Sequence, residues 1–168
     1  RMLNEEGRVR FLTDKLMLDW ETRVASLALV TTNVGSTVTV VSAWTDATNS
    51  RPISNIMTVR NNIYLGTGYM PNRMLFGYQA WNNFIQSDQA KNSLTNPNVT
   101  GGGFLPMADA VARYFSVDRV LIGGAIRNTA DEGQAQTLAD IWSDNVLIYY
   151  APLQPSVEFP SWMYSFRW

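Results

Sequence analysis

EEGRVRFLTDKLMLDWETRVASLALV, residues 5–30, is the longest segment of the chain with one clear periodicity. Its apolar residues recur at intervals of three or four, which is the spacing of one face of an α-helix. This apolar stripe consists of Val9, Leu12, Leu16, Trp20, Val24 and Leu27. The sequence therefore predicts a single long helix whose apolar face requires a partner surface.

The other faces of this predicted helix carry charges and a few further apolar residues. Opposite charges stand four residues apart in four pairs, each contributing about 0.3 kcal/mol to a helix. The pairs are Glu6 with Arg10, Arg10 with Asp14, Lys15 with Asp19, and Asp19 with Arg23. We interpret them as support for the helix and not as catalytic groups. Phe11, Met17 and Leu18 lie off the stripe, which predicts that a second face is covered too.

The rest of the chain, after this helix, has the pattern of short strands mixed with short helices. Strands are expected at residues 37–41, 73–76, 119–122, 146–150 and 162–168. The continuously apolar run at 146–150 is typical of a central strand covered on both faces. Ser50 is expected to cap a helix that has Pro52 in its first turn and ends at residues 66–68. Further helices are expected at 78–86 and 105–115, with one helical turn at 138–142.

Residues 87–103 and the polar segment that ends at Gln136 lack periodicity, so both are expected to be irregular. The longer of the two, residues 87–103, is predicted to be a surface loop that can serve as an assembly contact. We find no internal repeat and no linker that divides the chain. The order of elements indicates a mixed α+β fold.

The composition excludes several classes of chemistry. The 168 residues include no Cys and no His, which rules out disulfides, thiolate sites, histidine general bases and the usual zinc sites. No cofactor and no metal site is predicted. With a net charge of −1, the chain lacks the basic excess of proteins whose main function is binding nucleic acid. No apolar run is long enough to cross a membrane, and the first residues do not resemble a signal peptide.

The charged and aromatic content points to surfaces that become covered. Charged residues make up 16% of the chain, against about 25% in typical domains. The chain has eleven Arg, two Lys and 12% aromatic residues, and protein interfaces are enriched in Arg and aromatics and depleted in Lys. Burial against other chains and an aromatic core within one domain both fit this composition.

Two local motifs suggest chemistry but have simpler explanations. Gly101-Gly102-Gly103 precedes a predicted helix but lacks the lysine and Ser/Thr of a phosphate-binding loop, so we interpret it as flexible loop. Two carboxylates can support glycoside hydrolysis without histidine, and Asp131-Glu132 and the Asp140/Asp144 pair are the candidates. Adjacent carboxylates rarely point into one site, and carboxylates four apart at a helical turn are expected to face solvent. No catalytic residue is therefore predicted.

Several blocks in the second half of the chain, taken together, resemble one known family. They are VDRVLIGGA at 117–125, NTADEGQ at 128–134, LADIW at 138–142, VLIYYAP at 146–152 and YSFRW at 164–168. Their order and spacing resemble the major capsid proteins of tailed bacteriophages across about the last hundred residues. FLTDKL at 11–16, with Glu21, Val24 and Ala25, is similar to the long spine helix of that family.

This resemblance implies the tailed-phage capsid fold and a mechanical function. Residues 1–48 would hold the spine helix and the start of a peripheral domain, 49–145 mainly an axial domain of mixed sheet flanked by helices, and 146–168 the strands that return to the peripheral domain. The protein would form hexamers and pentamers of an icosahedral shell, located in the virion and assembled in the host cytoplasm. Its partners would be other copies of itself, with a scaffold, portal or maturation protease as further candidates. Packaged DNA would be touched only by weak, non-specific contacts.

The chain also differs from the family at both ends. The N-terminal arm and extended loop that precede the spine helix in relatives are absent, and relatives continue beyond Trp168. We therefore expect a trimmed core that stays monomeric or forms small oligomers. The predicted subunit-interface residues are Trp20 on the long helix and, on the last strand, Trp162, Tyr164, Phe166 and Trp168.

Two alternatives remain open at this point. A bacterial nanocompartment shell protein has a similar fold but encloses enzymes. A small carboxylate-based hydrolase or carbohydrate-binding domain belongs to a different functional class and is supported only by unpaired Asp residues and exposed aromatic residues.

Overall fold

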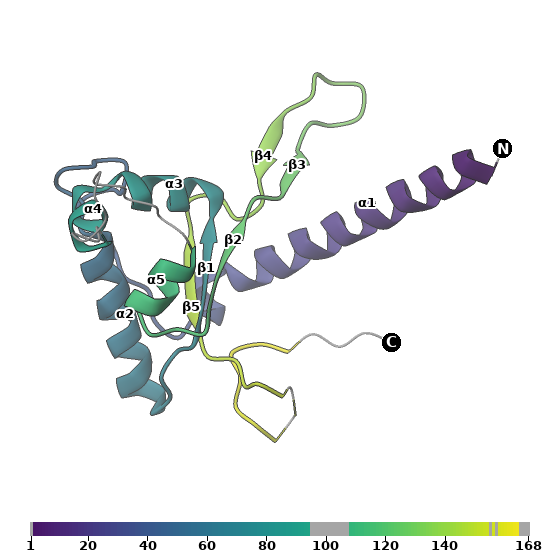
Figure 1. Cartoon of the computed structure of the whole chain (residues 1–168). Helices are drawn as coiled ribbons and strands as arrows, with labels where there is room; N and C mark the ends of the chain where they lie inside the picture. Colours follow the sequence, from purple (N-terminus) through teal and green to yellow (C-terminus); the bar gives the residue numbers. More distant parts are fainter. Residues whose placement is uncertain (1, 95–107, 155, 157, 165–168) are drawn as a thin grey trace.

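The computed structural model describes residues 2–94, 108–154, 156 and 158–164. Two parts stand out in Figure 1: a body made of a sheet with helices packed on it, and a long helix that extends away from this body. The architecture is α+β, as the sequence predicts. In the described part of the chain, no helix has both the length and the apolar character needed to cross a membrane.

The extended helix is α1, Met2–Ala28, and it confirms the prediction of one long helix. Its C-terminal end is held by the Asn33 side chain, whose Nδ2 donates a hydrogen bond to the Leu27 carbonyl at 2.9 Å. Of the four predicted charge pairs, Asp19 and Arg23 form an ion pair at 2.8 Å. The other three do not form ion pairs among the described residues. The ammonium group of Lys15 lies instead over the Phe11 ring, 5.5 Å from its centre.

The main sheet has three strands in the order β2-β1-β5. The middle strand, β1 (Arg73–Gly77), runs parallel to β2 (Arg119–Gly123) and antiparallel to β5 (Val146–Tyr149). All three strands were expected, but the central position expected for 146–150 is wrong. That run lies at an edge of the sheet, and it is apolar because its two faces contact two different clusters of side chains.

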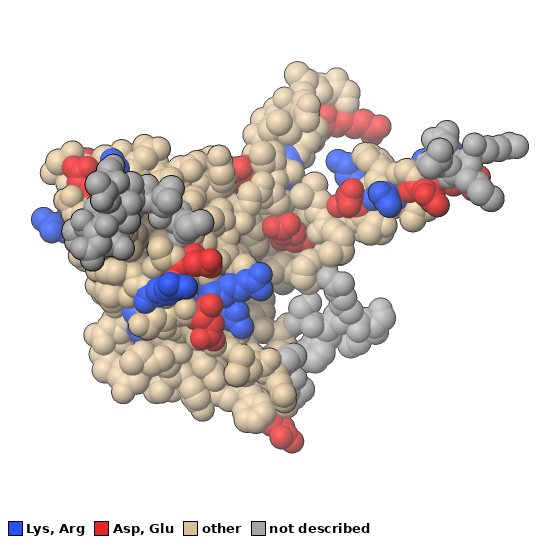
Figure 2. Space-filling model, viewed as in Figure 1, with Lys and Arg blue, Asp and Glu red and all other residues tan. Residues whose placement is uncertain are grey.

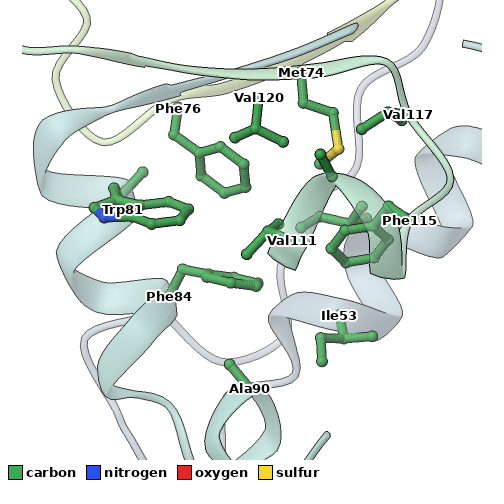
Figure 3. Close-up of a cluster of buried hydrophobic side chains, with 13 residues drawn as sticks. Ile53, Met74, Phe76, Trp81, Phe84, Ala90, Val111, Phe115, Val117 and Val120 are labelled. Atoms are coloured by element: carbon green, nitrogen blue, oxygen red, sulfur yellow. The ribbon is translucent and has the colours of Figure 1, made fainter. Parts of the chain in front are cut away.

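The larger cluster fills the space between the sheet and four helices (Figure 3). These helices are α2 (Pro52–Thr67), α3 (Tyr78–Gln86), α4 (Asp88–Leu94) and α5 (Ala108–Tyr114). Met74 and Phe76 point from β1 toward the helices and are fully buried. Phe76, Trp81 and Phe84 contact one another, with ring centres 5.4–5.9 Å apart. Because Trp81 and Phe84 are three residues apart on α3, one helical face contributes two of the three rings.

A smaller cluster lies on the opposite face of the sheet and attaches α1 to the body. Its buried members are Ala25, Ala28, Ile141, Trp142 and Leu147. The indole Nε1 of Trp142 donates a hydrogen bond to Glu21 Oε1 at 2.8 Å. The same indole explains Gly123, where an added Cβ would lie 2.3 Å from Trp142 Cδ1. The last quarter of α1 therefore belongs to the body, and the preceding part extends from it.

The segment between β2 and β5 departs from the sequence expectations. Residues in the polar segment form strand β3 (Ile126–Asn128), which pairs antiparallel with β4 (Leu138–Asp140). The helical turn predicted at 138–142 is therefore wrong. Three-residue strands carry too little periodicity to be recognised, and their structure comes from pairing with each other. The resulting hairpin projects from the body in Figure 1.

Three expectations for the segment from residue 37 to residue 103 are also corrected. Residues 37–41 are not a strand, because no neighbouring strand pairs with this β-branched run. Ser50 is not the N-cap of α2: that position is taken by Arg51, and Gln89 Oε1 accepts a hydrogen bond from the Ile53 amide at 3.1 Å. Part of the predicted loop at 87–103 is helix α4. The Ser87 hydroxyl caps this helix by accepting from the Ala90 amide at 3.2 Å.

Three further expectations concern the end of α2, the helix at 105–115 and the final strand. Gly68 ends α2 in the left-handed conformation, with φ of 74° and its amide donating to the Tyr64 carbonyl. The helix expected at 105–115 is observed as α5, although residues 105–107 are outside the described part. The final strand expected at 162–168 is wrong for residues 162–164, which are irregular. Residues 165–168 lie outside the described residues.

Candidate assembly surfaces

The first candidate surface is the apolar stripe on α1. Val9, Leu12 and Leu16 are 62%, 60% and 71% exposed, and Leu27 near the body is 57% exposed. Trp20, predicted from the sequence as an interface residue, is 39% exposed. In the described chain, the stripe is thus largely left open to solvent. A run of large apolar side chains open on one helix face is typical of a surface that another molecule covers.

The contact between α1 and the body uses a different face of the helix. Ala25 and Ala28 are buried, while Leu27 between them is exposed. Leu18, off the stripe, and Val24, on it, pack partly against the same cluster. The prediction that a second face is covered is therefore confirmed near Leu18. It is wrong within the described chain for Phe11 and Met17, which are 60% and 47% exposed. The buried residues of α1 in this contact are both alanines, and their small side chains let α1 approach the sheet closely.

The second candidate surface lies around the C-terminal segment. Trp162 is half-buried and its ring lies 5.3 Å from that of Tyr149 on β5. The single O–H of Tyr164 is shared between two carbonyl acceptors, that of Ser156 at 2.6 Å and that of Phe159 at 2.5 Å. Both predicted residues are therefore engaged within their own chain, and Trp162 packs against the same cluster as α1. The other two predicted residues, Phe166 and Trp168, lie outside the described residues.

A row of polar side chains crosses the sheet next to Trp162. Arg119, Arg73 and Tyr149 occupy neighbouring positions on β2, β1 and β5. Burial raises the pKa of the Tyr149 phenol, and the two arginines oppose that rise. Figure 2 shows both charge signs gathered over α5 and the adjoining ends of β1 and β2. This row could not be predicted from the sequence, because the three residues are brought together only by strand pairing.

A cavity of about 830 Å³ lies between α2, β5 and the irregular segment that follows α1. Val38, Val40, Ile63 and Trp162 are among the residues that line it. Its described lining is mainly apolar and amide-bearing, and Asp144 carries the one formal charge in it. The β-branched run that was expected to form a strand thus lines a cavity instead.

The candidate carboxylates of the hydrolase alternative occupy separate positions. Asp131 and Glu132 are exposed in the loop of the β3–β4 hairpin. Asp140 ends β4 and accepts a hydrogen bond from Gln79 Nε2 at 2.8 Å, while Asp144 is exposed in the turn before β5. The described residues contain no group of three or more carboxylates placed to hold a metal ion. The candidate carboxylates therefore do not converge on one place as an acid and a base.

Sequence reasoning missed Asn72, which ties together the three strands of the main sheet. Its Nδ2 donates to the Ala151 carbonyl at 2.8 Å and to Asp118 Oδ2 at 3.0 Å, and its Oδ1 accepts from the Ala151 amide at 2.9 Å. Asn72 stands just before β1, Asp118 just before β2, and Ala151 just after β5. The Pro71-Asn72 pair before an apolar run was the one available signal, and it indicates only a turn.

No protein-family model matches the sequence, and no curated protein matches it significantly. Its structure is similar to the crystal structure of a phage-related protein from Bordetella bronchiseptica RB50, with a TM-score of 0.73 and 21% sequence identity. The match covers 91% of this chain and 49% of that protein, so this chain spans about half its length. At this identity the likeness shows that the two chains share a fold.

Proposed function

We propose that this chain is the core of a structural subunit of a phage or prophage capsid, with the tailed-phage capsid fold. In this proposal, α1 is the spine helix, and the three-stranded sheet with its helices forms the axial part. Copies of the intact protein assemble into hexamers and pentamers of an icosahedral shell that encloses double-stranded DNA. The shell forms in the host cytoplasm, with a scaffold, portal or maturation protease as further partners.

The observation that carries this proposal is the exposed apolar face of a helix that extends from the body. Leu12 and Leu16 are mostly exposed to solvent. Exposed apolar side chains raise the free energy of the isolated molecule, and a second molecule that covers them lowers it again. A shell subunit needs such surfaces, because symmetry repeats each contact many times. The structural likeness to a phage-related protein supports the same assignment.

The direct test is negative-stain microscopy of the full-length gene product expressed alone and with its neighbouring genes. Closed particles of uniform size are the expected result. Replacing Trp20 with Ala in the full-length protein is expected to lower particle yield, and Tyr78→Ala, at an aromatic residue that is also exposed but lies on α3, serves as the control. Full-length protein that remains unassembled under all of these conditions contradicts the proposal.

The content of the particles separates the capsid from the nanocompartment alternative. Nuclease-protected double-stranded DNA is expected inside a capsid, and enclosed enzymes without DNA are expected inside a nanocompartment. Turnover of a glycoside by the pure protein, or specific binding in a glycan screen, would instead favour the hydrolase or carbohydrate-binding alternative.

A further inference from the structure

The exposed stripe of α1 carries a charge pattern that fits a second copy of the same helix. Glu5, Arg8, Asp19 and Arg23 are all exposed, and helical periodicity places them toward one side of the stripe. Figure 2 shows positive and negative side chains alternating along α1. In the described part of the chain, neither Glu5 nor Arg8 forms an ion pair. These two charges are therefore available to a partner.

Reversing the helix about Asp14 brings opposite charges on this side of the stripe together. Two antiparallel copies related by a two-fold axis beside Asp14 would place Glu5 opposite Arg23 and Arg8 within one residue of Asp19. The same register places Leu12 opposite Leu16, and Val9 within one residue of Trp20. In an antiparallel helix pair each flank faces the same flank of the partner, so the charges on this side of the stripe meet one another. In a parallel pair each flank faces the opposite flank of the partner, so these four charges would not meet one another.

The position of α1 leaves room for this partner. The helix contacts its own body through Ala25, Ala28 and, from the stripe, Val24, whereas the other stripe residues are exposed. Figure 1 shows most of α1 clear of the body. A second helix can therefore lie along the stripe without displacing the sheet.

We propose that α1 pairs antiparallel with α1 of a second copy, forming a two-fold dimer through its apolar stripe. The contact is isologous, because each copy contributes the same surface and every ion pair occurs twice. It deepens the proposed self-assembly by naming one of its contacts, but it concerns this chain in solution and does not depend on shell formation.

The first experiment measures the mass of the chain by sedimentation equilibrium at micromolar concentrations. A dimer is expected, with Leu16→Glu shifting the population to monomer and weakening association at least tenfold. Leu65→Glu is the matched control, because Leu65 is a comparably exposed leucine (74%) on α2. It is expected to leave the dimer intact, and circular dichroism checks that both variants keep their helix content. A wild-type chain that sediments as a monomer, or equal weakening by both variants, overturns the proposal.

The second experiment tests direction and register by cross-linking. Since the chain has no Cys, one introduced cysteine is the only thiol. Antiparallel pairing beside Asp14 puts the two copies of Thr13→Cys about 10 Å apart, within reach of a short bis-maleimide. The same pairing separates the two copies of Ser26→Cys by about 36 Å along the helix axis. Efficient cross-linking of the first variant alone is expected, and equal cross-linking of both would show a parallel pair and overturn the proposal.

The charge pairing is tested by a reversal. Arg8→Glu is expected to weaken the dimer, because the new carboxylate meets Asp19 of the other copy. Combining it with Asp19→Arg is expected to restore the dimer, whereas Asp19→Arg alone weakens it. Failure of the double variant to regain affinity over both single variants would overturn the proposed register. Shell formation by the full-length protein is measured separately, so either proposal can fail while the other stands.

Discussion

The body and the extended part of α1 use apolar residues in opposite ways. In the body, Phe76, Phe84 and Phe115 are completely buried between the sheet and its helices. Along α1, Phe11, Leu12 and Leu16 are at least 60% exposed. Burying such a side chain contributes about 1.5–3 kcal/mol, so the body stabilises the monomer and the extended part of α1 does not. One chain thus contains both a completed core and an apolar surface that only another molecule can cover.

The largest expected effect on stability is at Phe84 in the body, compared with Phe11 on α1. Phe84→Ala is expected to lower the free energy of unfolding by about 3–5 kcal/mol, because it leaves a cavity beside Phe76 and Trp81. Phe11→Ala on α1 is expected to cost less than about 1 kcal/mol, because it removes only an exposed ring and its contact with Lys15. Urea denaturation of both variants measures the difference. Equal losses would mean that the extended part of α1 is as integral to the monomer as the body.

A smaller effect is expected at Asn72, which joins the ends of the three strands. Asn72→Ala is expected to cost about 2 kcal/mol, since it leaves the half-buried Ala151 amide and carbonyl without their partners. Asn62→Ala is the control, because the Asn62 side chain makes an exposed hydrogen bond to Ser36 Oγ at 3.3 Å. The same urea titrations provide the measurement. Similar values for the two variants would show that the Asn72 bonds are replaced by water.

The junction between the two regions is tested at Glu21. Glu21→Ala removes the acceptor of the Trp142 indole hydrogen bond and is expected to cost about 1 kcal/mol. Tryptophan fluorescence should report the change around Trp142. Glu6→Ala, at an exposed glutamate on the extended part of α1, should leave stability within about 0.5 kcal/mol. An unchanged Glu21 variant would indicate that Ala25 and Ala28 alone attach the helix.

The smallest expected effect concerns Tyr149 at alkaline pH. Burial raises the pKa of Tyr149 in the folded state above its ordinary value of 10.0. The unfolded chain therefore releases this proton first, and stability falls as the pH rises from the ordinary pKa through the folded-state pKa. Tyr149→Phe is expected to flatten this fall, whereas Tyr78→Phe at an exposed position serves as the control. Urea midpoints measured below and above the ordinary pKa give the comparison, and an identical slope in all three proteins would contradict it.

Local pattern was sufficient wherever an element is defined by its own sequence. The stripe and length of α1 follow from a repeat of three and four residues. The bounds of α3 follow from Trp81 and Phe84 on one face, and the end of α2 from the glycine at 68. These features depend on contacts between residues a few positions apart, so they can be predicted from the local sequence pattern. The apolar strands β1 and β2 were found for the same reason.

Only the tertiary structure decided which surfaces meet. Residues 37–41 have strand composition but no strand beside them, whereas 126–128 and 138–140 lack strand composition and pair with each other. Helix α4 depends on the Ser87 cap and the burial of Ala90 against the core. The same distinction applies to the candidate surface on α1. The apolar stripe could be predicted from residues 5–30, but its exposure to solvent could not. Sequence determines which side chains share a face, while burial depends on non-local contacts that form only when the whole chain has folded.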